Sequence, residues 1–114
     1  MAHAWSLGSS AGFYQIVQAG PGSQYGLSAW CLDDAASVTS VYRMMLQYYD
    51  TSGTLLGSDI LNLSPLVSNS WQQLSLTGNL TPPNTATVRV VFDASNMVSG
   101  EILRIDDVTL TRVQ

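Results

Sequence analysis

The chain has 114 residues, which is enough for one domain with a hydrophobic core and too few for two. Charged residues make up only 11% of it, against about 25% in average soluble proteins, and the net charge of -4 argues against nucleic-acid binding because phosphates would be repelled. Hydrophobic residues make up 46%, which argues against disorder. They nowhere run for the about 18 residues that membrane insertion requires.

A surface so poor in charge has to be covered mainly by Ser, Thr, Asn and Gln. Such a neutral surface suits a module that faces neutral polymers, or a subunit that packs against copies of itself. Cys31 is the only cysteine, so no internal disulfide is possible. We therefore expect an extracellular protein, or one on a cell or virion surface.

Apolar and polar residues alternate along almost the whole chain, and turn residues separate the alternating runs. The two-residue period predicts strands at residues 12–18, 24–32, 40–50, 54–61, 70–78, 85–93 and 101–111. The sequence "TSG" at 51–53 predicts a hairpin with Gly53 at a positive φ. The fold class is therefore all-β, an antiparallel β-sandwich. We expect a single domain over residues 1–114, with residues 1–11 as a loosely ordered N-terminal segment.

Several motifs resemble those of jelly-roll carbohydrate-binding modules with a galactose-binding-like fold. "PGSQYGLSAW", "LQYYDTSGTLLG", "SWQQLSLTGNLTPPNTATVRVVF" and "ILRIDDVTL" stand in the order and at the spacing of the corresponding family motifs. The resemblance covers residues 13–111, nearly the whole chain. It implies a jelly-roll sandwich and a carbohydrate partner.

The N-terminal region departs from this family pattern. Such modules usually open with a strand whose glutamate helps to bind a structural calcium ion, and the first Asp of the closing pair commonly completes that site. The resemblance thus assigns Asp106 to calcium, but the only glutamate here is Glu101 and no opening strand is predicted. Without that strand one sheet has an uncovered edge, which can pair with another chain.

Asp106 and Asp107 are unusual within a strand, because Asp competes for backbone hydrogen bonds. The two-residue period places Asp106 on the core-facing row of Val108 and Leu110, and Asp107 in solvent. A buried carboxylate needs a cation, an arginine or backbone donors. Asp106 is therefore a calcium ligand, a hydrogen-bonded cap at a strand end, or a catalytic group.

Aromatic and planar polar residues suggest a binding surface. Sugar rings stack on aromatic side chains, and neighbouring Arg and Gln side chains hydrogen-bond the hydroxyl groups. On the outward row of their strands, we expect five residues to form such a surface: Trp30, Arg43, Gln47, Tyr49 and Arg89. The alternative is that Trp30 and Tyr49 pack under a loop or at a protein interface. We assign the remaining strand aromatics to the core: Tyr25, Tyr42, Tyr48 and Trp71.

The sequence offers little for catalysis. The only histidine, His3, lies at the start of the chain, so no Ser/His/Asp set can be assembled. We therefore expect no enzymatic activity, and predict a module that binds neutral polysaccharide, with a structural calcium ion as its only candidate cofactor. The alternative is a self-assembling subunit of a filament, coat or viral appendage, completed by strand exchange into a homo-oligomer or polymer.

Overall fold

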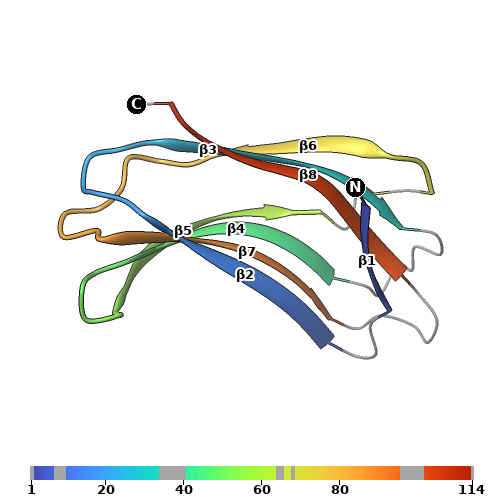
Figure 1. The fold of residues 1–114 in the computed structure, drawn as a ribbon, viewed down its shortest axis with the longest axis horizontal. Helices are drawn as coiled ribbons and strands as arrows, with labels where there is room; N and C mark the ends of the chain where they lie inside the picture. Colours follow the sequence, from blue (N-terminus) through green and yellow to red (C-terminus); the bar gives the residue numbers. More distant parts are fainter. Residues whose placement is uncertain are drawn as a thin grey trace.

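A computed structural model describes residues 2–6, 10–33, 41–63, 66–67, 69–95 and 102–113, with the backbone alone at 2–6, 10–14 and 102–103. Glu101 and the side chain of His3 lie outside this description. Within it the chain forms eight strands (Figure 1). Their bounds are β1 Ala2–Ser6, β2 Ser10–Gln18, β3 Tyr25–Asp33, β4 Val41–Tyr49, β5 Leu55–Asn62, β6 Gln72–Thr77, β7 Thr87–Ser95 and β8 Ile102–Arg112.

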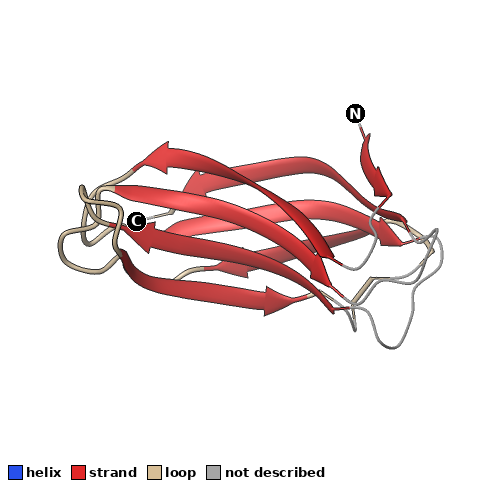
Figure 2. Ribbon diagram, turned by 90° about the horizontal axis from the view of Figure 1, so that it is seen from below, coloured by secondary structure: helices blue, strands red, loops and turns tan. Residues whose placement is uncertain are grey.

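The strands form two four-stranded antiparallel sheets, in the orders β1–β8–β3–β6 and β2–β7–β4–β5. Figure 1 shows the two sheets as layers, with β3, β6 and β8 above β2, β4, β5 and β7, and Figure 2 shows the sandwich from below. The chain crosses between the sheets at every connection between consecutive strands except that from β4 to β5, as in a jelly roll. The predicted all-β sandwich is confirmed, and each of the seven predicted strands has its counterpart in β2 to β8.

One strand, β1, was not predicted. It pairs with β8 from Ala2 opposite Asp106 to Ser6 opposite Ile102, and so lies on the edge that the sequence analysis expected to be uncovered. The expectation of a missing opening strand is therefore wrong for residues 2–6. A five-residue segment is too short for a two-residue period to stand out, which is why it was missed. The strand-exchange hypothesis loses one of its supports, the missing strand, and keeps the low charge of the chain.

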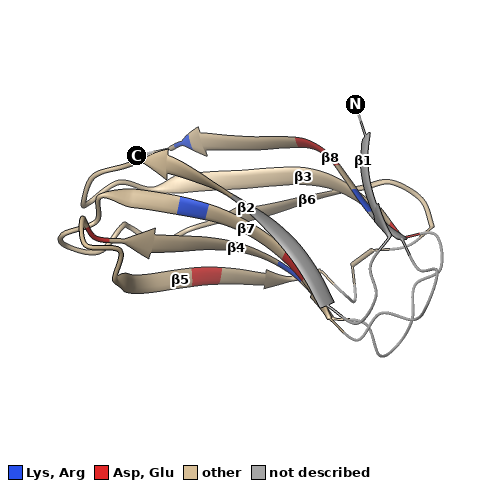
Figure 3. Cartoon of the chain, turned by 60° about the horizontal axis from the view of Figure 1, so that its bottom comes forward, with Lys and Arg blue, Asp and Glu red and all other residues tan. Residues whose placement is uncertain are grey.

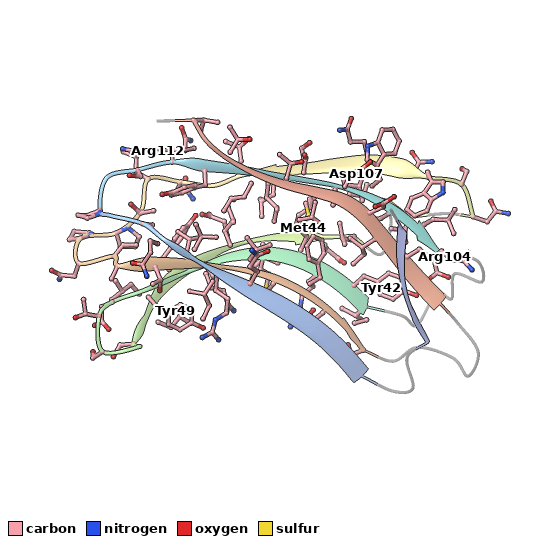
Figure 4. The ribbon with its side chains drawn as sticks, viewed as in Figure 1. Tyr42, Met44, Tyr49, Arg104, Asp107 and Arg112 are labelled. Atoms are coloured by element: carbon pink, nitrogen blue, oxygen red, sulfur yellow. The ribbon has the colours of Figure 1, made fainter. Side chains whose placement is uncertain are left out.

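The core lies between the inner faces of the two sheets. Tyr25, Tyr42 and Tyr48 are buried as predicted, and so is Cys31. Figure 4 shows Tyr42 and Met44 between the layers. Trp71, by contrast, is 38% exposed, so its assignment to the core is wrong.

Two buried or half-buried carboxylates accept hydrogen bonds from tyrosine hydroxyl groups of β4, one across the two sheets and one within its own sheet. Tyr42 of β4 donates a hydrogen bond to Asp33 of β3, which is fully buried. Tyr48 of β4 donates to Oδ2 of Asp59 at 2.6 Å, and Asp59 also accepts the backbone and side-chain N–H groups of Asn79 at 3.0 and 2.6 Å. These donors offset the cost of taking a carboxylate out of water.

The β4–β5 hairpin forms where the sequence predicted it. Gly53 has φ +85°, which confirms the predicted positive φ. Oδ1 of Asp50 accepts hydrogen bonds from the backbone N–H groups of Thr54 and Ser52, both at 2.9 Å. These bonds, that of Thr54 first, lower the pKa of Asp50 below its ordinary value. The turn is thus closed by the "DTSGT" sequence itself.

Cys31 is expected to be chemically inert in the folded protein. It is fully buried, and burial raises the pKa of its thiol to about 11, whereas a free thiol titrates near 8.5. At pH 8 Ellman's reagent should therefore label Cys31 only after urea denaturation. The pKa of this thiol is higher in the folded chain than in the unfolded chain. Its contribution to the free energy of unfolding is therefore complete below about pH 8.5 and is lost as the pH rises towards 11. Rapid labelling under native conditions would contradict this prediction.

Candidate functional site

Four of the five predicted binding residues lie on the outer side of the β2–β7–β4–β5 sheet. Buried residues alternate along β4 and β7, so the residues between them point away from the core. Figure 4 shows this for β4, where Met44 lies between the sheets and Tyr49 on the far side of its own sheet. We call this surface the β4–β7 face, comprising Arg43, Met45, Gln47, Tyr49, Arg89, Val91 and Asp93.

One end of the β4–β7 face holds a cluster of an aromatic ring, an amide and a guanidinium. Gln47 stands directly opposite Arg89 in the pairing of the two strands. Cζ of Arg89 lies 4.4 Å from the centre of the Tyr49 ring, and the Tyr49 hydroxyl donates to Oε1 of Gln47 at 3.0 Å. The three side chains thus hold one another in place, and all three are partly exposed. Three of the five predicted binding residues, Gln47, Tyr49 and Arg89, are therefore neighbours, and their role in binding stays a prediction.

The other end of the face holds an ion pair. Arg43 stands directly opposite Asp93, and its Nε and Nη2 donate to the two carboxylate oxygens at 2.9 and 2.6 Å. These hydrogen bonds and the charge of Asp93 raise the pKa of Arg43. The Arg43 side chain is 44% exposed, so the pair contributes little to stability but fixes the orientation of two planar groups.

Apolar side chains separate the two polar ends. Met45 of β4 stands opposite Val91 of β7 on one side and Ile60 of β5 on the other. Met45 is only 4% exposed although it points outward, because its neighbours cover it, whereas Ile60 is 51% exposed. The face therefore has an apolar middle with hydrogen-bonding groups at both ends. Charged residues are sparse in the part of the chain that the structure describes, as Figure 3 shows.

Trp30, the fifth predicted residue, does not belong to this surface. It lies on β3 in the opposite sheet, 37% exposed on that sheet's outer side. The prediction that Trp30 neighbours Arg43, Gln47 and Tyr49 is therefore wrong. The two-residue period correctly indicated that these side chains point outward. A sandwich has two outer sides, however, and the strand order decides on which of them a residue lies.

The adjacent carboxylates of β8 are explained by a β-bulge. The pairing of β3 with β8 shifts between Ser28, which faces Thr109, and Trp30, which faces Asp106. Asp107 sits in this irregularity with φ +50°, and its N–H donates to Oδ1 of Asp106 at 2.9 Å. Asp tolerates this left-handed conformation better than most residues. The bulge inserts one residue and reverses the alternation, so Asp106 lies beside Trp30 and its predicted place on the core-facing row is wrong.

Asp107 is expected to tolerate glycine but not valine. A β-branched residue pays a steric cost in the left-handed region that glycine does not, so Asp107→Val should destabilise the protein by about 1–2 kcal/mol. Asp107→Gly should stay within about 0.5 kcal/mol of the original stability. Urea unfolding followed by circular dichroism measures both. Equal stabilities of the two variants would contradict the role of the bulge.

The calcium assignment of Asp106 stays a prediction. Calcium takes about six to eight oxygen ligands. Among the residues that the structure describes, no three His, Cys, Asp or Glu side chains gather in one place, and one Asp106 oxygen already accepts the Asp107 N–H. The described residues therefore place no second and third side chain of these types beside Asp106.

Comparison with known proteins finds matches to the fold but none to the sequence. No family model matches the chain, and no curated protein matches its sequence. A solved structure of the enzymatically active domain of bacteriophage CBA120 tailspike protein 4 matches 98% of this chain with a TM-score of 0.79 and 20% identity. This chain spans only 15% of the tailspike chain.

Carbohydrate-binding modules match over most of their own length. A family 16 carbohydrate-binding module matches 95% of this chain and 74% of its own, with a TM-score of 0.72 and 23% identity. The module TmCBM61, solved in complex with β-1,4-galactotriose, matches 97% and 70%, with a TM-score of 0.57 and 18% identity. The chain thus has the jelly-roll β-sandwich fold of carbohydrate-binding modules, as its motifs indicated. Its described residues include no helix long and apolar enough to cross a membrane.

Proposed function

We propose that this chain is a non-catalytic carbohydrate-binding module that holds neutral polysaccharide on its β4–β7 face, outside the cell or on a cell or virion surface. The observation that carries the proposal is the arrangement of that face. Planar hydrogen-bonding groups stand at both ends, each held by a neighbour, and the exposed side chain of Ile60 on the neighbouring β5 borders the apolar middle between them. A sugar presents both apolar ring faces and hydroxyl groups, and the face offers a partner for each.

The face carries few charges, which is compatible with a neutral ligand. Arg43 is matched by Asp93 at one end, and Arg89 is stacked on Tyr49 at the other. Glycoside hydrolysis needs two carboxylates about 5–10 Å apart, whereas the residues named for this face include one, Asp93, which is paired with Arg43. The described part of the face therefore supports binding rather than cleavage. Similarity of fold to carbohydrate-binding modules adds to this support.

Affinity electrophoresis tests the proposal. The chain is run through native gels that contain galactomannan, xylan or β-1,4-galactan, with either calcium or EDTA, beside a reference protein that binds no glycan. Slower migration in at least one gel, without release of reducing sugar, is the expected result. Unchanged migration in every gel would contradict the function. Loss of retardation in EDTA would support the calcium assignment, and equal retardation would contradict a calcium requirement for binding.

A further inference from the structure

The second outer surface of the sandwich carries two half-exposed indoles. Trp30 of β3 is 37% exposed, and Trp71, the residue just before β6, is 38% exposed. Trp30 faces Gln73 in the pairing of β3 with β6, and Trp71 lies two positions before Gln73. Alternation therefore brings the two tryptophans to the same side of the sheet. They are diagonal neighbours on adjacent chain segments, a position at which Cα atoms are about 7–8 Å apart.

Polar side chains surround these indoles. We call the surface the β3–β6 face, comprising Ser28, Trp30, Trp71, Gln73, Ser75, Arg104 and Asp106. Gln73 and Asp106 face Trp30 on its two sides, and Ser75 faces Ser28 further along. Arg104 and Asp106 are two positions apart on β8, on the same side of the strand, so their charges balance.

We infer that the β3–β6 face is a second carbohydrate-binding surface, on which a neutral glycan chain stacks against Trp30 and Trp71 and hydrogen-bonds Gln73, Ser28 and Ser75. The module then holds one glycan on each side of the sandwich and links two polysaccharide chains. The ligand class rests on the proposed function, whereas the surface itself does not involve the β4–β7 face.

The chemistry of the face favours a glycan over a protein partner. Protein interfaces have a continuous apolar centre surrounded by a polar rim. Here the exposed aromatic groups are two separate rings, with an amide and hydroxyl groups beside them, and Val108 of β8 is exposed as well. A chain of sugars presents the same mixture, because each ring has C–H faces and hydroxyl edges. The balance of Arg104 against Asp106 fits a ligand without charge.

The experiment uses calorimetry with oligosaccharides of whichever polysaccharide retards the chain. The unaltered chain is expected to bind two oligosaccharides. A double variant with Trp30→Ala and Trp71→Ala should bind only one, and so should a double variant with Tyr49→Ala and Arg89→Met. The exposed change Gln73→Arg covers Trp30 without removing it, and this variant should also bind one oligosaccharide. Because no tryptophan is lost, it shows that the missing binding does not result from misfolding. In a Trp5→Phe background, ligand should shift the fluorescence of the two remaining tryptophans even when Tyr49 and Arg89 are replaced.

The outcomes separate the two proposals. Binding of one oligosaccharide that is insensitive to Trp30→Ala, Trp71→Ala and Gln73→Arg overturns the second surface and leaves the proposed function standing. Binding that is lost entirely with the tryptophans and insensitive to Tyr49→Ala overturns the β4–β7 face instead. If the tryptophan changes convert an oligomer into a monomer on size-exclusion chromatography and alter no binding, the face is a protein interface and the inference fails. If no polysaccharide binds, both proposals fail.

Discussion

Tyr49→Ala is expected to weaken polysaccharide binding to the β4–β7 face about 10- to 100-fold, or about 1.4–2.7 kcal/mol. The ring of Tyr49 holds the guanidinium of Arg89, and its hydroxyl fixes the amide of Gln47. Its removal therefore costs a stacking surface and frees two hydrogen-bonding partners at once. Calorimetry measures the loss, in a chain with Gln73→Arg so that the opposite face does not contribute.

Tyr49→Phe is the matched control. It keeps the ring over Arg89 and removes only the hydrogen bond to Gln47, so the affinity should fall about 3- to 10-fold, between those of the parent and Tyr49→Ala. Thermal unfolding of both variants should stay close to that of the parent, because Tyr49 is not part of the core. If Tyr49→Ala binds as well as the parent, ligand does not occupy this face.

Gly78→Ala is expected to destabilise the fold by about 2–4 kcal/mol, through overpacking and the loss of a partly buried hydrogen bond. A Cβ at residue 78 would lie 2.5 Å from the Tyr48 hydroxyl and 3.2 Å from Oδ2 of Asp59. These are the two atoms of the 2.6 Å hydrogen bond between β4 and β5, so one of them has to move. Gly78 itself is held in place, because its N–H donates to the Tyr25 carbonyl at 2.9 Å. Urea unfolding measures the loss.

Gly20→Ala provides the control, because nothing lies within 4 Å of the added Cβ. Its stability should equal or slightly exceed that of the parent. The Tyr48 titration gives an independent readout. Burial, followed by the hydrogen bond to Asp59 and its charge, raises the pKa of Tyr48, so its contribution to stability is complete below about pH 10 and is lost at higher pH. Gly78→Ala should lower this pKa in an absorbance titration, and an unchanged stability and titration would contradict the contact.

The alternation of residues was sufficient to predict most of the strands. The predicted run at 40–50 became β4, in which Tyr42 and Tyr48 are buried while Arg43 is exposed. Side-chain direction along a strand depends only on the local backbone, so the sequence carries it directly. The same reasoning failed at Asp106, because a bulge reverses the alternation without leaving a clear signal in the sequence.

Two features depended on long-range pairing. The segment 2–6 became a strand because β8 offers it an edge, not because its own residues predict one. Trp71 was assigned to the core because most strand aromatics are buried, yet it lies just before β6, beyond the last residue of that strand that pairs with β3. The strand propensity of the local residues cannot predict either outcome, because both depend on partners far away in the sequence.

The sequence by itself determined the all-β class, the strands from β2 to β8, the β4–β5 turn and which side chains on β3 and β4 point outward. All of these follow from local backbone geometry and the two-residue period. Only the tertiary structure decided that Trp30 and Tyr49 point outward on opposite sides of the sandwich, and that Arg43 meets Asp93. The order of strands within each sheet sets these neighbours, and that order results from the packing of the whole chain.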